Sequence, residues 1–345
     1  MRDGIDFWRL WPDLAPVAVA AAAICVALIL ALRPLLVRYA LARPNARSSH
    51  RQPTPQGGGI AVMTATIATA ALSSFWIGGI DPSALAQLRW ALAASAFIAV
   101  VGAVDDIRAV SVAPRLALQA LAVTIVIASL PADLHVLPFL PWWVERALLL
   151  FAGLWFVNLV NFMDGLDWMT VAEVVPATAG LVALGILGAL PVHGLIAALA
   201  LLGAVVGFAP FNRPVARLFL GDVGSLAIGL VLGWLLVLLA ARGHLAAALL
   251  LPLYYLADTT ITLVRRLANA EPVWQAHRTH FYQRATDNGF TVIAVVGHVF
   301  LVNVALASLA VAAVLIDTPA ASALFLLLGA ALVGWLLVRF ARNRT

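Results

Sequence analysis

The sequence predicts an all-α protein, a polytopic bundle of about eleven transmembrane helices that forms one domain over residues 1–345. Hydrophobic residues make up 63% of the chain and charged residues only 11%. The mean hydropathy is +1.01. Apolar runs of about twenty residues, enough to cross a hydrocarbon core of roughly 30 Å, recur from end to end. A water-soluble chain of this composition would expose patches that aggregate.

The spans are predicted in chain order from these runs and from the polar segments between them. The first run begins near Ala15 and is too long for the apolar part of a signal peptide, so we expect a retained span. Short gaps at Leu190–His193 and Asp317–Pro319 divide neighbouring spans late in the chain. The expected limits are residues 15–36, 60–80, 89–107, 112–131, 143–161, 171–190, 193–210, 218–241, 245–265, 290–316 and 318–340.

The arginines predict the orientation of the bundle. The chain has no lysine, so all 21 basic residues are arginine. Alternating spans put 16 of them on one face and leave 5 on the other, namely Arg2, Arg9, Arg89, Arg146 and Arg242. Because basic residues accumulate on the cytoplasmic side of membrane spans, we expect a periplasmic N-terminus and a cytoplasmic C-terminus. This asymmetry and anionic headgroups account for the pI near 10.3, so no nucleic-acid partner is expected.

Five polar segments fall on the predicted cytoplasmic face. They cover about residues 37–59, 104–111, 161–170, 211–225 and 266–289. The carboxylates of their acidic motifs are Asp105, Asp106, Asp164, Asp167 and Asp222. Carboxylates gathered at a membrane boundary repel one another unless a cation separates them. Mg²⁺ prefers oxygen ligands and usually binds one or two carboxylates together with phosphate oxygens, so a magnesium site for a phosphorylated substrate is expected.

The glycines and arginines of these segments also suit phosphate. "QGGG" and "GDVGS" would expose backbone N–H groups beside a helix start, and arginine binds phosphate with two hydrogen bonds. Other interpretations stay open. Asp105 and Asp106 could form a solvated helix end, and Asp222 could cap the eighth span. His277 and His280 could be an ordinary loop pair, and they lack the cysteine or third histidine of a zinc site.

Some polar residues within the apolar runs are candidates for function or for helix–helix contacts. Glu173 and Asp258 are functional candidates, because carboxylates within a membrane are costly, although each could pair with an arginine. His298 and Asn303 are expected to form hydrogen bonds between helices.

Together these motifs resemble the polyprenyl-phosphate N-acetylhexosamine-1-phosphate transferases, which are glycosyltransferases of the family 4 type. "VDDI", "NFMDGLD", "FLGDVGS" and "HRTHFYQR" are similar to four family motifs in the same order. "RPNARSSHRQPTPQGGGIAV" resembles the family's first cytoplasmic loop, so the likeness covers about residues 40–290.

The resemblance implies a magnesium-dependent enzyme of the bacterial inner membrane with a cytoplasmic active site. It would transfer a sugar-1-phosphate from a UDP-N-acetylhexosamine to undecaprenyl phosphate and release UMP. This reaction is the first membrane step of a surface polysaccharide such as O-antigen. The implied partners are these two substrates and the lipid bilayer, with a homodimer as a candidate assembly and Mn²⁺ as an alternative ion.

The resemblance also implies roles for individual residues. Asp222 and Asn161 would bind the metal, and Asp164 would shape its site. Asp105 would take a proton from the lipid phosphate or orient it, with Asp106 in support. Uracil would contact Asp167 and stack on Phe219. The diphosphate or sugar would be gripped by His277, Arg278 and His280.

Several residues depart from the family pattern. Ala109 stands where several members carry an acidic residue or lysine, and Trp168 and Met169 replace a small glycine. The last loop lacks the three consecutive histidines of the muramoyl-pentapeptide branch, so a peptidoglycan precursor is not expected. The main alternative is a transporter or ion channel with a carboxylate relay, which predicts acidic residues at mid-span in broken helices. A covalent aspartyl-phosphate route is an alternative to direct attack.

Overall fold

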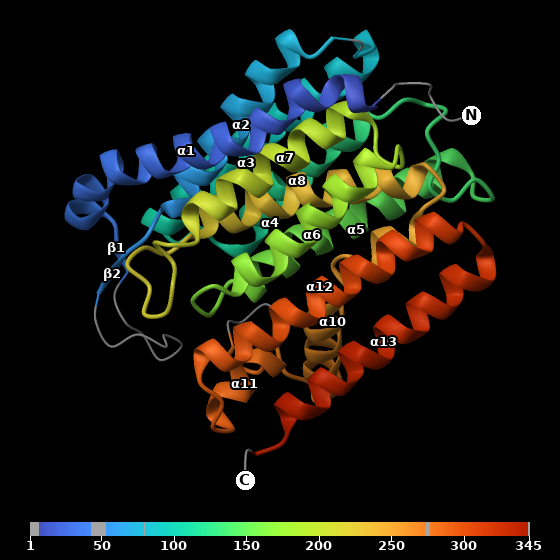
Figure 1. The fold of residues 1–345 in the computed structure, drawn as a ribbon. Coiled ribbons are helices and arrows are strands. Elements are labelled where there is room, and N and C mark those ends of the chain that lie inside the picture. Colours follow the sequence, from blue (N-terminus) through green and yellow to red (C-terminus); the bar gives the residue numbers. More distant parts are fainter. Residues whose placement is uncertain (1–6, 43–52, 79, 273–276, 344–345) are drawn as a thin grey trace.

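The computed structural model describes residues 7–42, 53–78, 80–272 and 277–343. Figure 1 shows a bundle of tilted helices in which α1 begins at one end and α13 finishes at the other. The elements are α1 (Phe7–Tyr39), β1 (Leu41–Ala42), β2 (Thr54–Pro55), α2 (Gly58–Trp76), α3 (Pro82–Ile107), α4 (Val112–Ala128), α5 (Trp142–Met163), α6 (Met169–Ile186), α7 (Val192–Phe208), α8 (Asp222–Ala241), α9 (Leu245–Leu250), α10 (Leu253–Ala268), α11 (Phe281–Asp287), α12 (Val292–Ile316) and α13 (Pro319–Ala341).

The helical bundle confirms the predicted fold class of a polytopic helical membrane protein. Within the described residues, 8 helices are long and apolar enough to cross a membrane. The helices α4 and α7 are apolar but shorter. The total of about eleven spans and the sidedness of the termini stay predictions.

The predicted ninth span is wrong as a continuous helix. Residues 245–265 divide into α9 and α10, with a break at Leu251 and Pro252. A proline inside a helix lacks the N–H of the hydrogen-bond ladder, and its ring clashes with the preceding turn. The break starts a new helix, α10, and that helix carries Asp258 and the arginine pair Arg265–Arg266 toward the predicted site.

The centre of the bundle is α8, the most deeply buried of the eight long apolar helices. It packs against α3, α5 and α2, and glycines allow its first turn to approach them closely. A Cβ at Gly59 of α2 would lie 2.3 Å from the Gly224 Cα. A Cβ at Gly102 of α3 would lie 2.3 Å from the backbone oxygen of Asp222. The ends of α3 and α5 and the start of α8 therefore meet at one end of the bundle, which we call the site end.

The close contact at Gly102 gives a stability prediction. Gly102→Ala should destabilise the protein by about 1–3 kcal/mol, because the added methyl group overlaps backbone that cannot rotate away. It should also lower any activity that depends on Asp222, whose backbone must shift. The measurement is thermal unfolding of the purified full chain in detergent. Gly297→Ala is the matched control, because a Cβ there would meet no heavy atom of the described residues within 4 Å. Equal unfolding temperatures for the two variants would contradict the packing described.

The first and fourth polar segments pair at the site end, where β1 and β2 lie beside the loop that precedes α8 (Figure 1). The backbone N–H groups of Gly57 and Gly58 donate to the Phe219 oxygen, at 3.2 and 2.8 Å, and the Gly59 N–H donates to the Leu220 oxygen at 2.8 Å. The prediction that "QGGG" offers N–H groups to phosphate is therefore wrong. These glycines join two loops, and residues 43–52 of the first loop lie outside the described residues.

Candidate active site

Asp222 lies in the first turn of α8 and is tied to the end of α5. Asn161 donates its Nδ2 hydrogens to Asp222 Oδ1 and to Ser225 Oγ, both at 2.9 Å. The two predicted metal ligands, 61 residues apart in sequence, are therefore in direct contact. The amide of Asn161 orients the Asp222 carboxylate.

Asp105, near the end of α3, faces the same carboxylate. The carboxyl groups of Asp105 and Asp222 lie within hydrogen-bonding reach of each other. Arg115 of α4 forms an ion pair with Asp105 Oδ2 at 2.7 Å, and the Val110 N–H donates to Oδ1 at 2.7 Å. The Asp105 carboxylate is therefore held in a fixed orientation, with the Arg115 guanidinium group beside it.

Asp106 caps α8. Its Oδ1 accepts the Asp222 N–H at 2.9 Å and its Oδ2 accepts the Val223 N–H at 3.1 Å. Gln56, from the first loop, also donates its side-chain amide to Asp106. A carboxylate at a helix N-terminus satisfies free N–H groups and interacts favourably with the helix dipole. The N–H groups of Asp222 and Val223 at the start of "GDVGS" therefore bind Asp106. The prediction that these N–H groups are free to bind phosphate is wrong.

Asp164 follows the last residue of α5 and adds a further carboxylate. Thr170 donates its hydroxyl to Asp164. Burial raises the pKa of Asp164 to about 8, and the negative charges of Asp222, Asp106 and Asp167 add to this rise. Without a counter-ion, this carboxyl group therefore keeps its proton at neutral pH.

The ligand chemistry of the site fits Mg²⁺ or Mn²⁺. Asp105, Asp222 and Asp164 offer only oxygen atoms, which hard divalent cations prefer. Over the described ranges, no group of three or more His, Cys, Asp or Glu side chains is arranged to hold a metal by itself. Mg²⁺ usually needs only one or two carboxylates, with phosphate and water completing its shell. A cation here would relieve the repulsion that raises the pKa of Asp164.

The two residues predicted to hold uracil lie in neighbouring loops. Asp167 Oδ2 accepts the Ala216 N–H at 2.9 Å, so this carboxylate helps to shape the loop before α8. Trp168 fixes the same loop, because its Nε1 hydrogen is donated to the Ala209 oxygen at 2.6 Å. Phe219 accepts hydrogen bonds from the first loop through its backbone. Uracil binding by Asp167 and Phe219 stays a prediction.

The histidine segment lies between α10 and α11. His280 is 2% exposed, and its Nδ1 lies 3.2 Å from Asp258 Oδ1. His277 lies beside it, with ring centroids 4.8 Å apart. Arg278 turns to α11 and pairs with Asp287 Oδ1 at 3.3 Å. The two histidines are therefore brought together, while Arg278 is engaged within its own loop.

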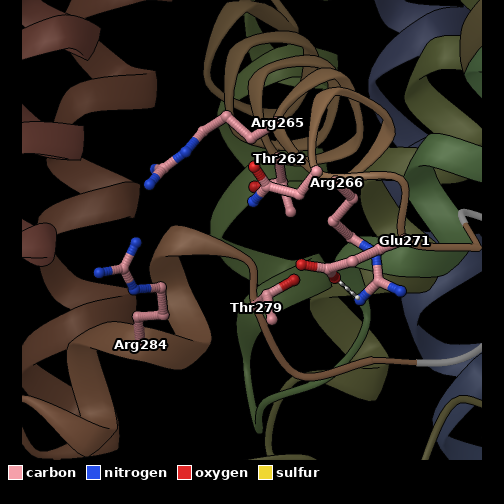
Figure 2. Close-up of a pocket in the computed structure, with 7 residues that line it drawn as sticks. Thr262, Arg265, Arg266, Glu271, Thr279 and Arg284 are labelled. Atoms are coloured by element: carbon pink, nitrogen blue, oxygen red, sulfur yellow. Dashed lines mark ion pairs between the residues drawn. The ribbon is translucent and has the colours of Figure 1, made fainter.

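A cavity of about 190 Å³ opens beside this segment. Its lining comes from α10, α11 and the loop between them, and consists of Thr262, Arg265, Arg266, Asn269, Glu271, Thr279 and Arg284. Figure 2 shows Arg265 and Arg284 on one side of the opening, across from the Arg266–Glu271 ion pair. Arg265 lies over the Phe281 ring. Neither Arg265 nor Arg284 has a carboxylate partner among the described residues, so both guanidinium groups are available to an anion.

Sequence reasoning missed the roles of these cavity arginines and of Asp258. In the sequence analysis, Arg265 and Arg284 were used only to predict the orientation of the bundle in the membrane. The loop connecting α10 to α11 brings the two arginines together, and the "RR" pair at the end of α10 was the only local signal. Asp258 was named as a functional candidate that could pair with an arginine, and its partner in the structure is His280.

The other polar residues within spans have structural partners. Asn303 donates to Glu173 Oε2 at 2.6 Å and to the Ala172 oxygen at 3.0 Å, so it links α12 to α6 as predicted. The prediction for His298 is wrong, because its Nδ1 bonds the Ala294 oxygen of its own helix. Glu173 therefore also has a partner other than arginine.

Comparisons with known proteins cover the part of the chain that holds this site. The model of the family "Glycosyl transferase family 4" matches residues 88–240, which hold Asp105, Asp164 and Asp222. The chain is similar to a probable undecaprenyl-phosphate N-acetylglucosaminyl 1-phosphate transferase of Bacillus subtilis, at 25% identity over 83% of each chain. It is also similar to the undecaprenyl-phosphate alpha-N-acetylglucosaminyl 1-phosphate transferase of Thermotoga maritima, at 25% identity over 76% of this chain and 79% of that one.

A third relative is similar over a shorter region. The phospho-N-acetylmuramoyl-pentapeptide-transferase of Carboxydothermus hydrogenoformans is 37% identical, but over only 32% of this chain and 33% of its own. Together, the family match and these relatives support the family that the motifs resemble, glycosyl transferase family 4.

Proposed function

We propose that this protein transfers N-acetylhexosamine-1-phosphate from a UDP-sugar to undecaprenyl phosphate and releases UMP. The observation that carries the proposal is the meeting of Asp105, Asn161 and Asp222, from three separate helices, at one end of an apolar bundle. The names of the relatives supply the acceptor class and suggest N-acetylglucosamine as the first sugar to test.

The reaction needs two anions to meet. An oxygen of the lipid phosphate attacks the β-phosphorus of the UDP-sugar and forms a new phosphorus–oxygen bond. The bond from that phosphorus to the oxygen bridging the two phosphates breaks, and UMP leaves with the bridging oxygen. Transfer of this kind depends mainly on positioning and on stabilisation of charge.

Each residue of the site has a part in this proposal. Asp222 and Asn161 hold Mg²⁺, which, when bound, offsets the charge of the phosphates and of the departing UMP. Asp105 orients the lipid phosphate rather than acting as a strong base, because Arg115 already holds its carboxylate. The second pKa of a phosphate monoester is near 6, so little acceptor needs deprotonation at neutral pH.

The position of the site suits substrates from two phases. We infer that the prenyl chain stays in the inner membrane while its phosphate reaches the site end from the bilayer. The UDP-sugar enters from the cytoplasm, and its diphosphate meets the histidine segment and the free guanidinium groups of Arg265 and Arg284. A surface polysaccharide such as O-antigen is the proposed product, and a homodimer is the proposed assembly.

The test is an incubation of the purified full chain with undecaprenyl phosphate, Mg²⁺ and single UDP-sugars. UDP-N-acetylglucosamine, UDP-N-acetylgalactosamine and a UDP-muramoyl-pentapeptide are compared, with UMP and lipid products measured by mass spectrometry. We expect equal amounts of UMP and lipid-diphosphate sugar from one of the simple sugars. Both products should disappear when the lipid or the divalent ion is removed. If none of these donors gives UMP, the proposal is wrong and the transporter alternative is favoured. The relevant feature for that alternative is Asp258, which lies in α10 after the α9–α10 break.

A further inference from the structure

We propose that Asp258 is a positioning residue that fixes the ring of His280, so that its Nε2 atom is presented to the nucleotide sugar. This inference rests on the proposed function and adds to it a residue that lies outside the four family motifs.

Asp258 is fully buried and organises the start of α11. Its Oδ1 accepts the Phe281 N–H at 3.0 Å, and its Oδ2 accepts the Tyr282 N–H at 3.1 Å. The hydroxyl groups of Tyr254 and Thr262, from the same helix α10, donate at 3.1 and 3.3 Å. These donors compensate the cost of burying a charge. The carboxylate therefore locks α11 onto α10.

The contact with His280 assigns the roles of the two ring nitrogens. An ionised carboxylate only accepts hydrogen bonds, so the Nδ1 atom of His280, 3.2 Å from Asp258 Oδ1, must carry a hydrogen. Nε2 is the other ring nitrogen, and it is buried without a hydrogen-bond partner among the described residues. Leaving such an atom unpaired costs about 1–3 kcal/mol, so a ligand group is the expected partner.

The contacts of the ring place His280 beside the segment that carries the predicted site residues Asn161 and Asp164. Phe162, which follows Asn161, has its ring centroid 6.5 Å from that of His280. The Tyr282 hydroxyl donates to the Phe162 oxygen at 3.0 Å, and a Cβ at Gly165 would lie only 2.2 Å from that hydroxyl. The capped helix α11 is therefore fitted directly against the segment that carries Asn161 and Asp164.

The chemistry follows from this placement. When an anionic diphosphate arrives, a protonated His280 donates from Nε2 to a phosphate oxygen, and Asp258 balances the charge of the imidazolium. Other titratable groups that face this ring are Tyr282 from α11 and His277 from the preceding loop, and Tyr254 of α10 contacts the Asp258 carboxylate. Nδ1 of His280 lies 3.2 Å from Asp258 Oδ1, so Asp258 sets the hydrogen on that atom.

The test compares Asp258→Asn with Glu173→Gln in the full chain. Glu173 is an equally buried carboxylate, but its partner is Asn303 and no histidine. Histidine ¹⁵N NMR spectra at alkaline pH report which ring nitrogen carries the hydrogen, and His280→Gln identifies the signal. Kinetics with UDP-N-acetylglucosamine and thermal unfolding are measured on the same samples.

We expect the wild-type His280 signal to show hydrogen on Nδ1, and Asp258→Asn to shift it toward hydrogen on Nε2. The value of kcat/KM should fall on the order of a hundredfold in Asp258→Asn and stay unchanged in Glu173→Gln. An unchanged His280 signal in Asp258→Asn would overturn the inference, even if stability fell, because it would leave Asp258 as a helix cap alone.

Two further outcomes keep the test decisive. If Asp258→Asn does not fold, His280→Asn keeps the two hydrogen bonds from the Phe281 and Tyr282 N–H groups to Asp258. It must lose kcat/KM to a similar degree; full activity would overturn the inference. The NMR result needs no turnover. A wild-type enzyme without UMP release but with the expected shift would therefore refute the proposed function, whereas turnover with an unchanged signal would refute only the role of Asp258.

Discussion

Asp222→Ala is expected to lower UMP release by about a thousandfold, or roughly 4 kcal/mol of barrier, while the bundle stays folded. The carboxylate lies between Asn161 and Asp105 and is the proposed centre of the metal site. Its removal takes a negative charge out of a crowded cluster, so no loss of stability is expected. Asp105→Ala should abolish turnover similarly, because the lipid phosphate loses its orienting group. UMP release and thermal unfolding are measured together.

Asp133→Asn is the control for this experiment. Asp133 is an exposed acid in the loop between α4 and α5, at the other end of the bundle. It should keep full activity and the wild-type unfolding temperature. Near-normal turnover in Asp222→Ala would show that the metal site has been assigned to the wrong residue.

Asp106→Ala should lower both activity and stability, in contrast to Asp222→Ala. The substitution removes the acceptors of the Asp222 and Val223 N–H groups and the partner of Gln56. Loss of a helix cap costs roughly 1–2 kcal/mol, and the start of α8 would lose its fixed position. We expect a lower unfolding temperature and at least a tenfold loss of turnover, in line with misplaced reacting groups.

Thr291→Ala is the matched control for loss of a cap. The Thr291 hydroxyl accepts the Ala294 N–H at 3.2 Å at the start of α12, away from the carboxylate cluster. It should lower stability without a specific loss of turnover per folded molecule. An Asp106→Ala protein that is stable and fully active would refute the capping role.

The helices and the meeting of the loops could be predicted from the sequence. Apolar runs fix where most helices lie, because about twenty such residues match the membrane thickness. The alternation of these runs then places "VDDI", "NFMDGLD" and "FLGDVGS" at one end. The contact of Asn161 with Asp222 confirms this expectation.

The roles of neighbouring carboxylates could not be predicted in the same way. Asp105 and Asp106 are adjacent in sequence, yet one faces Asp222 and the other caps α8. The assignment of these two roles to Asp105 and Asp106 depends on how α3 is rotated against α8. The close approach of the two helices at Gly102 sets that rotation. The pairing of Asp258 with His280 likewise depends on the break at Pro252 and on the path of a long loop. Glycines in "QGGG" suggested phosphate binding, but their N–H groups bind backbone oxygens of a loop far along the chain.

Binding of Mn²⁺ to the full chain, followed by electron paramagnetic resonance, tests the metal site most directly. We expect one bound Mn²⁺ per chain that Mg²⁺ displaces. This binding should be lost in Asp222→Ala and kept in Asp133→Asn. Equal binding by Asp222→Ala and wild type would contradict a divalent ion held between α3, α5 and α8, and so would the absence of bound ion from an active wild-type enzyme.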